Sequence, residues 1–327
     1  MRRFCCAVLV LLGLSAPILA RGDDTPQPMP VNGQCSVSAD PQWTRQEKFV
    51  WQHVCVGEVA DFNKEPEPNY GGNLDPKRPE GLPESRILRP DFLETILFSD
   101  AYRRSLKRHG VRILGARLTE NLDLENARLE IDFRLRRSLL EKGANFSGLR
   151  SAYPIDLEGS KIIGLLRMDR LRVESGLSMR WGEFSEVSLA DAQVGGQLAL
   201  RGANITKQLT MSEVQIGASL YMNEAQFGKI VLRNVHVGGV LELNGSKVRG
   251  ALHSEGVQVK SDVFMSGYVS SVPVLGMGPI TLGQSQSREA EFDGPVHFLF
   301  GKVGGNFVIS GGYFHLGSEY YGNTDWR

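Results

Sequence analysis

The sequence predicts a mainly β fold, a solenoid of short strands that begins at Val111 and follows a small helical cap. The first observation is a pair of inward-type residues two apart that recurs after five residues and then after six. Because a strand alternates its side chains between two faces, each pair predicts one short strand with an inward face. The second observation is the composition, with 37 glycines and 8% aromatic residues, which suits short strands and tight corners.

Length, charge and hydrophobic content exclude several classes of protein. The chain has 327 residues, of which 41% are hydrophobic and 23% are charged, so it is neither disordered nor a multispan membrane protein. It holds 37 basic and 37 acidic side chains. A formal net charge of zero argues against a dedicated nucleic-acid-binding protein, which is normally basic.

Residues 1–20 predict a secretory signal peptide. Arg2 and Arg3 supply a positive start, an uncharged apolar run follows, and Ala20 is the predicted last residue before cleavage. The alternative, a retained membrane anchor, is disfavoured because the apolar run is short for a membrane span. The predicted mature protein is therefore exported, either periplasmic or secreted, with a formal net charge of −2.

Cys35 and Cys55 are the two cysteines of the predicted mature chain, and they predict a disulfide. A metal or redox pair is the alternative, but the CxxC spacing typical of such sites is missing. In the chain-entropy description, closing this loop stabilises the fold by about 3 kcal/mol.

Residues 21–110 predict a cap made of helices and loops. Asp40 followed by Pro41 predicts a helix start. The apolar residues that follow have helical spacing as far as Cys55, and we expect Gly57 to weaken the end of the helix. These residues therefore predict the first helix of the cap.

The second half of the cap combines a loop with a second helical region. Several prolines between residues 62 and 90 predict an extended loop. After the loop, apolar residues at helical spacing predict two short helices, or one that is interrupted at Ser99 and Asp100, ending at Gly110.

The repeat runs from residue 111 to residue 267. Its pairs are on average about 5.4 residues apart, so four pairs make a coil of about 22 residues. A helix cannot generate this spacing, and a meander would need hairpin turns. A coil cannot bury its own faces, so stacked coils supply the core and each end needs a cap. The pairs include Val111/Ile113, Ala116/Leu118, Leu122/Leu124, Leu166/Met168, Leu198/Leu200, Ala203/Ile205, Leu220/Met222 and Leu241/Leu243.

Glycines follow the pairs with smaller residues, and we expect them at the corners of the coil. Without a Cβ, glycine adopts backbone conformations that a β-branched residue resists. The outward positions carry mixed charged and amide side chains, as expected for a solvated wall. The glycines concerned are Gly195, Gly196, Gly217, Gly228, Gly238, Gly239 and Gly250.

The register of the repeat breaks at Gly267. Residues 268–289 contain prolines, glycines and serines and predict an inserted loop. The pattern resumes at Ala290 and Phe292, so residues 290–327 predict the last coil. Whether this coil is closed by its own aromatic residues, is covered by a partner or belongs to a shortened chain stays open.

Several units resemble those of the pentapeptide-repeat proteins, which read roughly A(D/N)Lxx. Examples are Ala116-Arg117-Leu118, Ala127-Arg128-Leu129, Ala192-Gln193-Val194 and Ala203-Asn204-Ile205. The resemblance implies a right-handed quadrilateral β-helix. The small residue marks only alternate faces and steps of six are frequent, so this is a degenerate version of the repeat.

A second resemblance covers residues 111–327. They are similar to a poorly characterised bacterial group with segments like GVRILGARL and VGGNFVISGG. Some members of that group carry the label "membrane-associated oxidoreductase". This resemblance implies the fold and assigns no activity.

No motif for a cofactor or a metal stands out. The string nearest to a dinucleotide fingerprint, Gly276–Thr281, lacks the third glycine and leads into no predicted helix. We therefore expect no flavin or nicotinamide cofactor. The six histidines have neither HxH nor HExxH spacing, and we expect surface residues with no metal bound. They are His53, His109, His236, His253, His297 and His315.

Four outward carboxylates are candidates for the acid pair of a carbohydrate-active β-helix enzyme. Each occupies an outward repeat position, where a charged residue is expected anyway. A solvated face is therefore the favoured interpretation, and we expect no catalytic residue. The four are Asp123, Glu125, Asp132 and Asp156.

Charge is distributed unevenly between the cap and the first coils. Residues 21–100 hold 8 basic and 14 acidic side chains, whereas residues 101–137 hold 10 basic and 5 acidic ones. Either the two regions attract each other, or the basic coils bind an anionic component of the cell envelope.

The sequence therefore predicts an exported, non-catalytic β-helical scaffold or interaction protein of the bacterial envelope. The alternative is a carbohydrate-binding or carbohydrate-active β-helix protein. We expect an envelope protein or glycan as partner, no nucleic acid, and membrane contact only through the signal peptide or at the periphery. Mimicry of duplex DNA, known among pentapeptide-repeat proteins, requires strong negative charge and a cytoplasmic protein, and this sequence predicts neither. The oligomeric state stays open.

Overall fold

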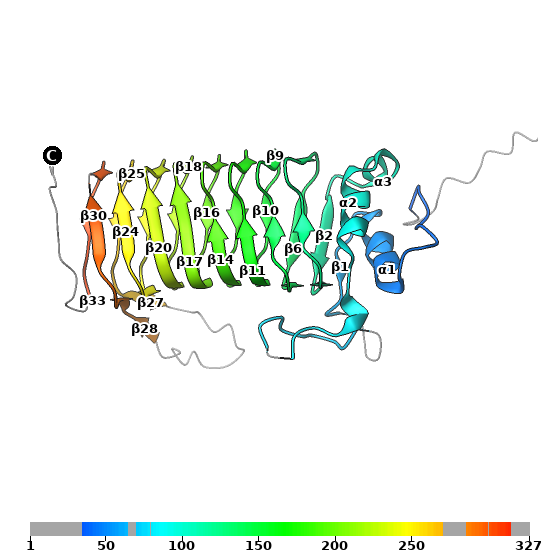
Figure 1. The fold of residues 1–327 in the computed structure, drawn as a ribbon, viewed down its shortest axis with the longest axis horizontal. Coiled ribbons are helices and arrows are strands. Elements are labelled where there is room, and N and C mark those ends of the chain that lie inside the picture. Colours follow the sequence, from blue (N-terminus) through cyan, green and yellow to red (C-terminus); the bar gives the residue numbers. More distant parts are fainter. Residues whose placement is uncertain (1–34, 65–69, 79, 271–285, 300, 315–327) are drawn as a thin grey trace, which may run out of the picture. The chain divides into compact units, whose positions relative to one another are not determined.

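The computed structural model describes residues 35–314 except 65–69, 79, 271–285 and 300. The predicted signal peptide, with its cleavage position after Ala20, lies outside these residues. The described chain is mainly β and forms a parallel β-solenoid after a small helical cap, as predicted (Figure 1). Within the described residues, no helix has both the length and the apolar character needed to cross a membrane.

Helices occur only before the solenoid in the described part of the chain. The predicted break at Ser99 and Asp100 is confirmed, because one helix ends just before Ser99 and the next begins at Asp100. The elements are α1 (Arg45–Val54), the 3-10 turn η1 (Glu84–Arg86), α2 (Pro90–Phe98) and α3 (Asp100–Ser105).

The predicted start of α1 at Asp40 and Pro41 is wrong, because Thr44 caps the helix. The Thr44 hydroxyl accepts from the Glu47 amide, and the Glu47 carboxylate accepts from the Thr44 amide, which together form a capping box. Asp40 instead closes a turn, where its carboxylate accepts from the Gln42 amide at 2.8 Å. A capping box satisfies two free amides at once, so it outcompetes the isolated Asp-Pro signal.

The cap has its own cross-links. Cys35 and Cys55 form the predicted disulfide, which ties the start of the described chain to the end of α1. Trp51 is fully buried, and its indole nitrogen donates to the Val37 carbonyl at 2.9 Å. Trp43 packs edge-on against Phe92 of α2, with ring centroids 4.9 Å apart.

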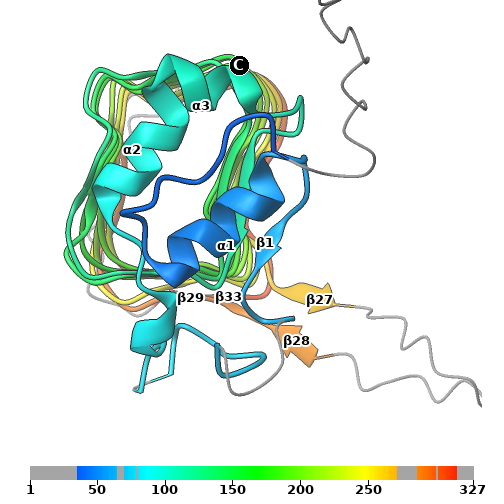
Figure 2. The ribbon, with the colours of Figure 1, turned by 90° about the vertical axis from the view of Figure 1, so that its right-hand side faces the viewer.

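The cap continues the sheets of the solenoid by one rung. Strand β1 (Ala60–Asp61) pairs in parallel with β2 (Val111–Leu114), and Ile87 forms an isolated bridge with Arg117. The three α-helices lie across this end of the coil (Figure 2). They therefore cover apolar side chains of the first coil, which no preceding coil would cover.

Each coil has four faces, and three parallel sheets run through the described part of the solenoid. Val111 pairs with Phe133, 22 residues later, which is the predicted coil length. Figure 2 shows the resulting four-sided outline. Sheet A consists of β1, β2, β6 (Phe133–Arg136), β10 (Ile155–Asp156), β13 (Leu177–Ser178), β16 (Leu198–Ala199), β19 (Leu220–Tyr221), β22 (Leu241–Glu242), β26 (Val263–Phe264) and β32 (Phe307–Val308).

Sheet B covers two of the four faces, because its longer strands run through the corner between them. Register shifts mark that corner, for instance between Ile162 and Leu165. Sheet B consists of β3 (Arg117–Leu118), β7 (Leu139–Leu140), β11 (Lys161–Arg167), β14 (Glu183–Ser188), β17 (Asn204–Ser212), β20 (Gln226–Arg233), β23 (Lys247–Val248), β29 (Ala290–Phe292), β33 (Gly312–Phe314), β4 (Leu122–Asp123), β8 (Ala144–Asn145), β24 (Leu252–Glu255) and β30 (Val296–Leu299).

Sheet C forms the fourth face and consists of two-residue strands. In each strand the first side chain is exposed to solvent and the second points inward. Its strands are β5 (Arg128–Leu129), β9 (Arg150–Ser151), β12 (Arg172–Val173), β15 (Gln193–Val194), β18 (Gln215–Ile216), β21 (His236–Val237), β25 (Gln258–Val259) and β31 (Lys302–Val303).

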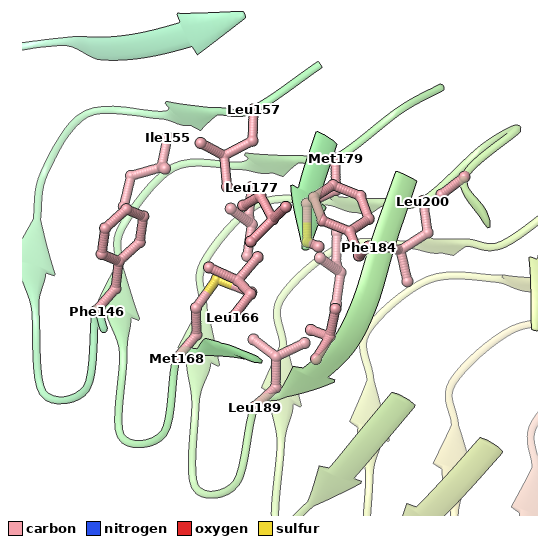
Figure 3. Close-up of a cluster of buried hydrophobic side chains, with 14 of the residues drawn as sticks. Phe146, Ile155, Leu157, Leu166, Met168, Leu177, Met179, Phe184, Leu189 and Leu200 are labelled. Carbon is pink, nitrogen blue, oxygen red and sulfur yellow. The ribbon is translucent and has the colours of Figure 1, made fainter. Parts of the chain in front are cut away.

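The inward pairs predicted from the sequence form the core of the solenoid. Leu166 and Met168, for example, are both fully buried. Side chains from successive coils stack on one another along the interior (Figure 3). Small polar members of the pairs are satisfied inside: the Ser160 hydroxyl accepts from the Ser138 amide at 3.1 Å and donates to the Leu135 carbonyl at 2.8 Å.

The reason predicted for the corner glycines is wrong, although their position at corners is right. Gly217 and Gly238 have no positive φ. A Cβ at Gly217 would lie 2.1 Å from the Gly195 carbonyl oxygen of the preceding coil. Close approach between coils therefore selects glycine at this corner. The left-handed corners are elsewhere and carry larger residues as well as glycines. The larger ones include Asn126, Arg170, Asp191, Glu213 and Asn234.

The two described ends of the inserted segment pair with each other. Strands β27 (Tyr268–Ser270) and β28 (Gln286–Arg288) pair antiparallel, where the sequence predicted a loop. After the hairpin the solenoid resumes in register, because Val248 pairs with Phe292, 44 residues later. The insertion therefore adds the length of one coil to the chain without adding a rung.

Candidate functional site

The outward positions of sheet C form one column of side chains that can donate hydrogen bonds. The strand register aligns these positions from coil to coil. None of the described members of this column is a carboxylate. From the cap end the column reads Arg128, Arg150, Arg172, Gln193, Gln215, His236, Gln258 and Lys302.

Beside the second half of this column lies a groove with a volume of about 1330 Å³. Gly195, Gly217 and Gly238 line its floor, so no side chain rises next to the column at these rungs. Gln193 and Gln215 stand along the groove. Amide side chains both donate and accept, so this part suits hydroxyl-bearing or amide-bearing ligands.

The first half of the column is cationic and has a groove on each side. One groove, of about 660 Å³, is lined by Arg128, Arg150, Arg172 and Tyr153, among others. The second, of about 510 Å³, is lined by Arg150 and Arg172 together with residues of the left-handed corner. Tyr153 is 43% exposed and lines the first of these grooves beside the arginines.

Two arginines on the neighbouring face form ion pairs, in contrast to those of sheet C. Along sheet A, Arg134 binds the Asp132 carboxylate at 2.6 Å, and Arg136 binds the Asp156 carboxylate. Within the described chain, the side chains of the sheet C arginines form no ion pair and no hydrogen bond. Successive strands are about 4.8 Å apart, so these like charges lie on adjacent rungs and repel one another.

The four candidate carboxylates do not converge on one groove. Asp132 and Asp156 belong to the ion pairs of sheet A described above. Asp123 accepts from the main-chain amide of Glu125 at 2.9 Å, and the Glu125 carboxylate accepts from the Asn145 side chain at 3.1 Å. These partners assign structural roles to all four groups.

The structure stacks two histidines that sequence spacing did not connect. His253 on β24 pairs in register with His297 on β30, and their ring centroids are 5.1 Å apart. Their separation of 44 residues is two coil lengths because the insertion lies between them. The signal was present in the resumption of the repeat at Ala290, which moves the later coils by one coil length.

Lowering the pH is expected to destabilise the coils around His253. Burial, followed by Lys229, His297 and Arg233, lowers the pKa of His253 below its ordinary value of 6.5. The neutral form is favoured in the folded state, so stability is complete above about pH 6.5 and falls as the pH drops towards the lowered pKa. Between pH 7.5 and pH 5.5, the melting temperature of H253Q should therefore fall less than that of the wild type.

His236→Gln provides the control for this prediction, because His236 is exposed in the sheet C column. Its melting temperature should follow the pH dependence of the wild type. Equal pH dependence in H253Q and the wild type would contradict the prediction.

Sequence reasoning missed most of the cationic half of the column. The charge asymmetry covered residues 101–137 and so included Arg128, but Arg150 and Arg172 lie beyond it. Reading every twenty-second residue would have found all three, because each occupies the same position of its coil.

The described residues contain no group of three or more His, Cys, Asp or Glu side chains placed to hold a metal ion. The nearest dinucleotide-like string, Gly276–Thr281, lies outside the described residues. No protein-family model, curated protein or solved structure matches the chain.

Proposed function

We propose that the protein is an exported, non-catalytic scaffold of the bacterial envelope that binds an extended partner along the outer wall of sheet C. The observation that carries this proposal is the column of donor side chains flanked by grooves. Each rung repeats a polar position after about 4.8 Å. An elongated protein segment or glycan fits such a wall better than a small molecule does, because it can contact many rungs at once.

We further propose that the solenoid is a degenerate pentapeptide repeat. Small inward residues such as Ala116 and Ala203, each followed two positions later by a larger apolar residue, support this description. Export is supported by the signal-like residues 1–20 and by the Cys35–Cys55 disulfide, because disulfides persist mainly in oxidising compartments.

Carbohydrate binding is the second candidate function, and the glutamines of the column, Gln193, Gln215 and Gln258, favour it. Catalysis on a carbohydrate would need two carboxyl groups about 5–10 Å apart beside the bound sugar. The described column of sheet C contains no carboxylate, and the four candidate carboxylates have structural partners. We therefore propose binding without turnover.

The experiment that tests the proposed function blocks the wall at one rung. In Gln215→Trp an indole would fill the groove beside an exposed position of sheet C. In the matched control Gln226→Trp the same change lies on an outward position of sheet B. Each full chain is immobilised and incubated with bacterial envelope extract, and retained polypeptides and glycans are quantified.

The wild type and Q226W should retain the same component, and Q215W should retain at least tenfold less of it. A chain that enriches no component would overturn the scaffold proposal. An equal loss in Q226W would show that sheet C is not the binding wall. Conversion of the retained glycan to shorter products would overturn the non-catalytic assignment.

A further inference from the structure

We infer that Arg128, Arg150 and Arg172 bind the carboxylate groups of a linear acidic polysaccharide, whose neutral hydroxyl groups lie along the adjoining glutamines. This inference rests on the proposed binding wall and names the chemistry of its ligand. The three arginines and the first two glutamines, Gln193 and Gln215, occupy five consecutive rungs of one column.

The geometry of the arginines points to a repeating anion. The three side chains emerge from equivalent positions of adjacent parallel strands, so their Cα atoms are about 4.8 Å apart. A guanidinium group binds a carboxylate with two parallel hydrogen bonds. Three such groups in a row match a polymer that presents carboxylates repeatedly along its length.

The lack of an ion-pair partner among the described residues supports the same conclusion. Along sheet A each of Arg134 and Arg136 binds an aspartate, whereas the three arginines of sheet C have no such partner among the described residues. Like charges on adjacent rungs destabilise the free protein. A bound polyanion supplies the ion pairs that these arginines lack in the described chain. It thereby relieves the repulsion between them, and this relief strengthens binding.

The surrounding side chains favour a glycan over a nucleic acid. Carboxylates border the arginines: Glu130, which is paired with Arg103 of α3, and Glu174 line one groove, while Asp191 and Glu213 line the other. These acids can accept hydrogen bonds from the hydroxyl groups of a sugar, which a phosphate backbone does not offer. Tyr153 offers an exposed ring against which a sugar can pack, and the glutamines offer partners for hydroxyl groups.

Binding of the full chain to three polymers tests the inference. Polygalacturonate carries a carboxylate on every sugar, dextran is a neutral glycan, and single-stranded DNA carries phosphates. The wild type should bind polygalacturonate at least tenfold more tightly than either of the other polymers. Its affinity should fall as salt is raised, because exposed charges are screened.

The decisive variant is the triple change R128Q/R150Q/R172Q, which extends the natural glutamine column. Its melting temperature should be at least that of the wild type, because the repulsion between the arginines is removed. Its affinity for polygalacturonate should fall by about eightfold or more, at roughly two- to fivefold for each of the three exposed charge contacts. Arg249→Gln, which changes an exposed arginine directly after β23, is the control and should bind as the wild type does. Gln193→Arg lengthens the arginine row and should tighten binding several-fold.

Three results would overturn the inference: no binding of polygalacturonate, equal or tighter binding of dextran or DNA, or unchanged affinity in the triple variant. These outcomes are distinct from failure of the proposed function. If Q215W loses the envelope component while the triple variant binds polygalacturonate normally, the wall stands and the arginine site falls. If the triple variant loses polygalacturonate while Q215W captures the envelope component normally, the arginine site stands and the assignment of that component to the sheet C wall falls.

Discussion

Replacing Arg86 with methionine is expected to lower the free energy of unfolding by about 4 kcal/mol. The side chain is fully buried between the cap loop and the first coil. It donates to the carbonyls of Tyr70 at 2.6 Å and Gly115 at 3.3 Å, and to the Asn63 side chain at 2.8 Å. Methionine fills similar space but leaves these buried acceptors unpaired, and each unpaired acceptor destabilises the folded state.

Urea denaturation of the full chain measures this effect, with Arg112→Met as the control. Arg112 also bonds the cap to the first coil, but it does so by donating to the Gly57 carbonyl at 2.6 Å from a partly buried position. R112M should lose only about 1 kcal/mol. If the free energy of unfolding falls no further in R86M than in R112M, the buried arginine does not stabilise the contact between the cap and the solenoid.

Gly110→Ala is expected to lower the free energy of unfolding by about 3–4 kcal/mol, for two separate reasons. The residue has φ +65°, where a Cβ is strained, and that Cβ would lie 2.1 Å from the Asp132 carbonyl oxygen. The same carbonyl accepts from the Val111 amide at 2.8 Å. Moving it away breaks a hydrogen bond between the first two coils.

Gly72→Ala separates the two reasons, because Gly72 has φ +67° and a Cβ there would meet no atom of the described chain within 4 Å. In Gly72→Ala the free energy of unfolding should fall by about 1 kcal/mol, from backbone strain alone. The difference between the two variants, measured by urea denaturation, gives the contribution of the close approach. Equal losses would show that the coils can separate without a large penalty.

The cap shows where sequence reasoning reached its limit. Apolar spacing located all three α-helices, but the start of α1 depends on competition between two capping signals. Thr44 prevails because Glu47 returns its hydrogen bond and also binds Arg89 at 2.9 Å. Burial raises the pKa of Glu47, yet the hydrogen bonds from Arg89 and Thr44 outweigh it and keep the pKa below its ordinary value. Arg89 is 42 residues from Glu47 along the chain, so the local sequence around Glu47 could not reveal this partner.

The candidate surface was only partly predictable. The sequence indicated basic early coils and polar outward walls. Charge counts cannot show more than this. It could not decide which arginines have counter-charges, because Arg136 and Asp156 meet only when one coil stacks on the next. The row from Arg128 to Arg172 could have been found from the predicted coil length, but its lack of ion-pair partners became visible only in the structure.

The sequence by itself determined the solenoid, its coil length, its inward residues and the disulfide. These follow from periodicity and from cysteine count, both of which can be read from the chain without knowing which distant residues meet. Tertiary structure alone decided the merging of two faces into sheet B, the contact between His253 and His297 across the insertion, and the close approach that selects glycine at one corner. Each of these depends on the distance between neighbouring coils, and residues 22 or 44 positions apart meet only after the coils have stacked.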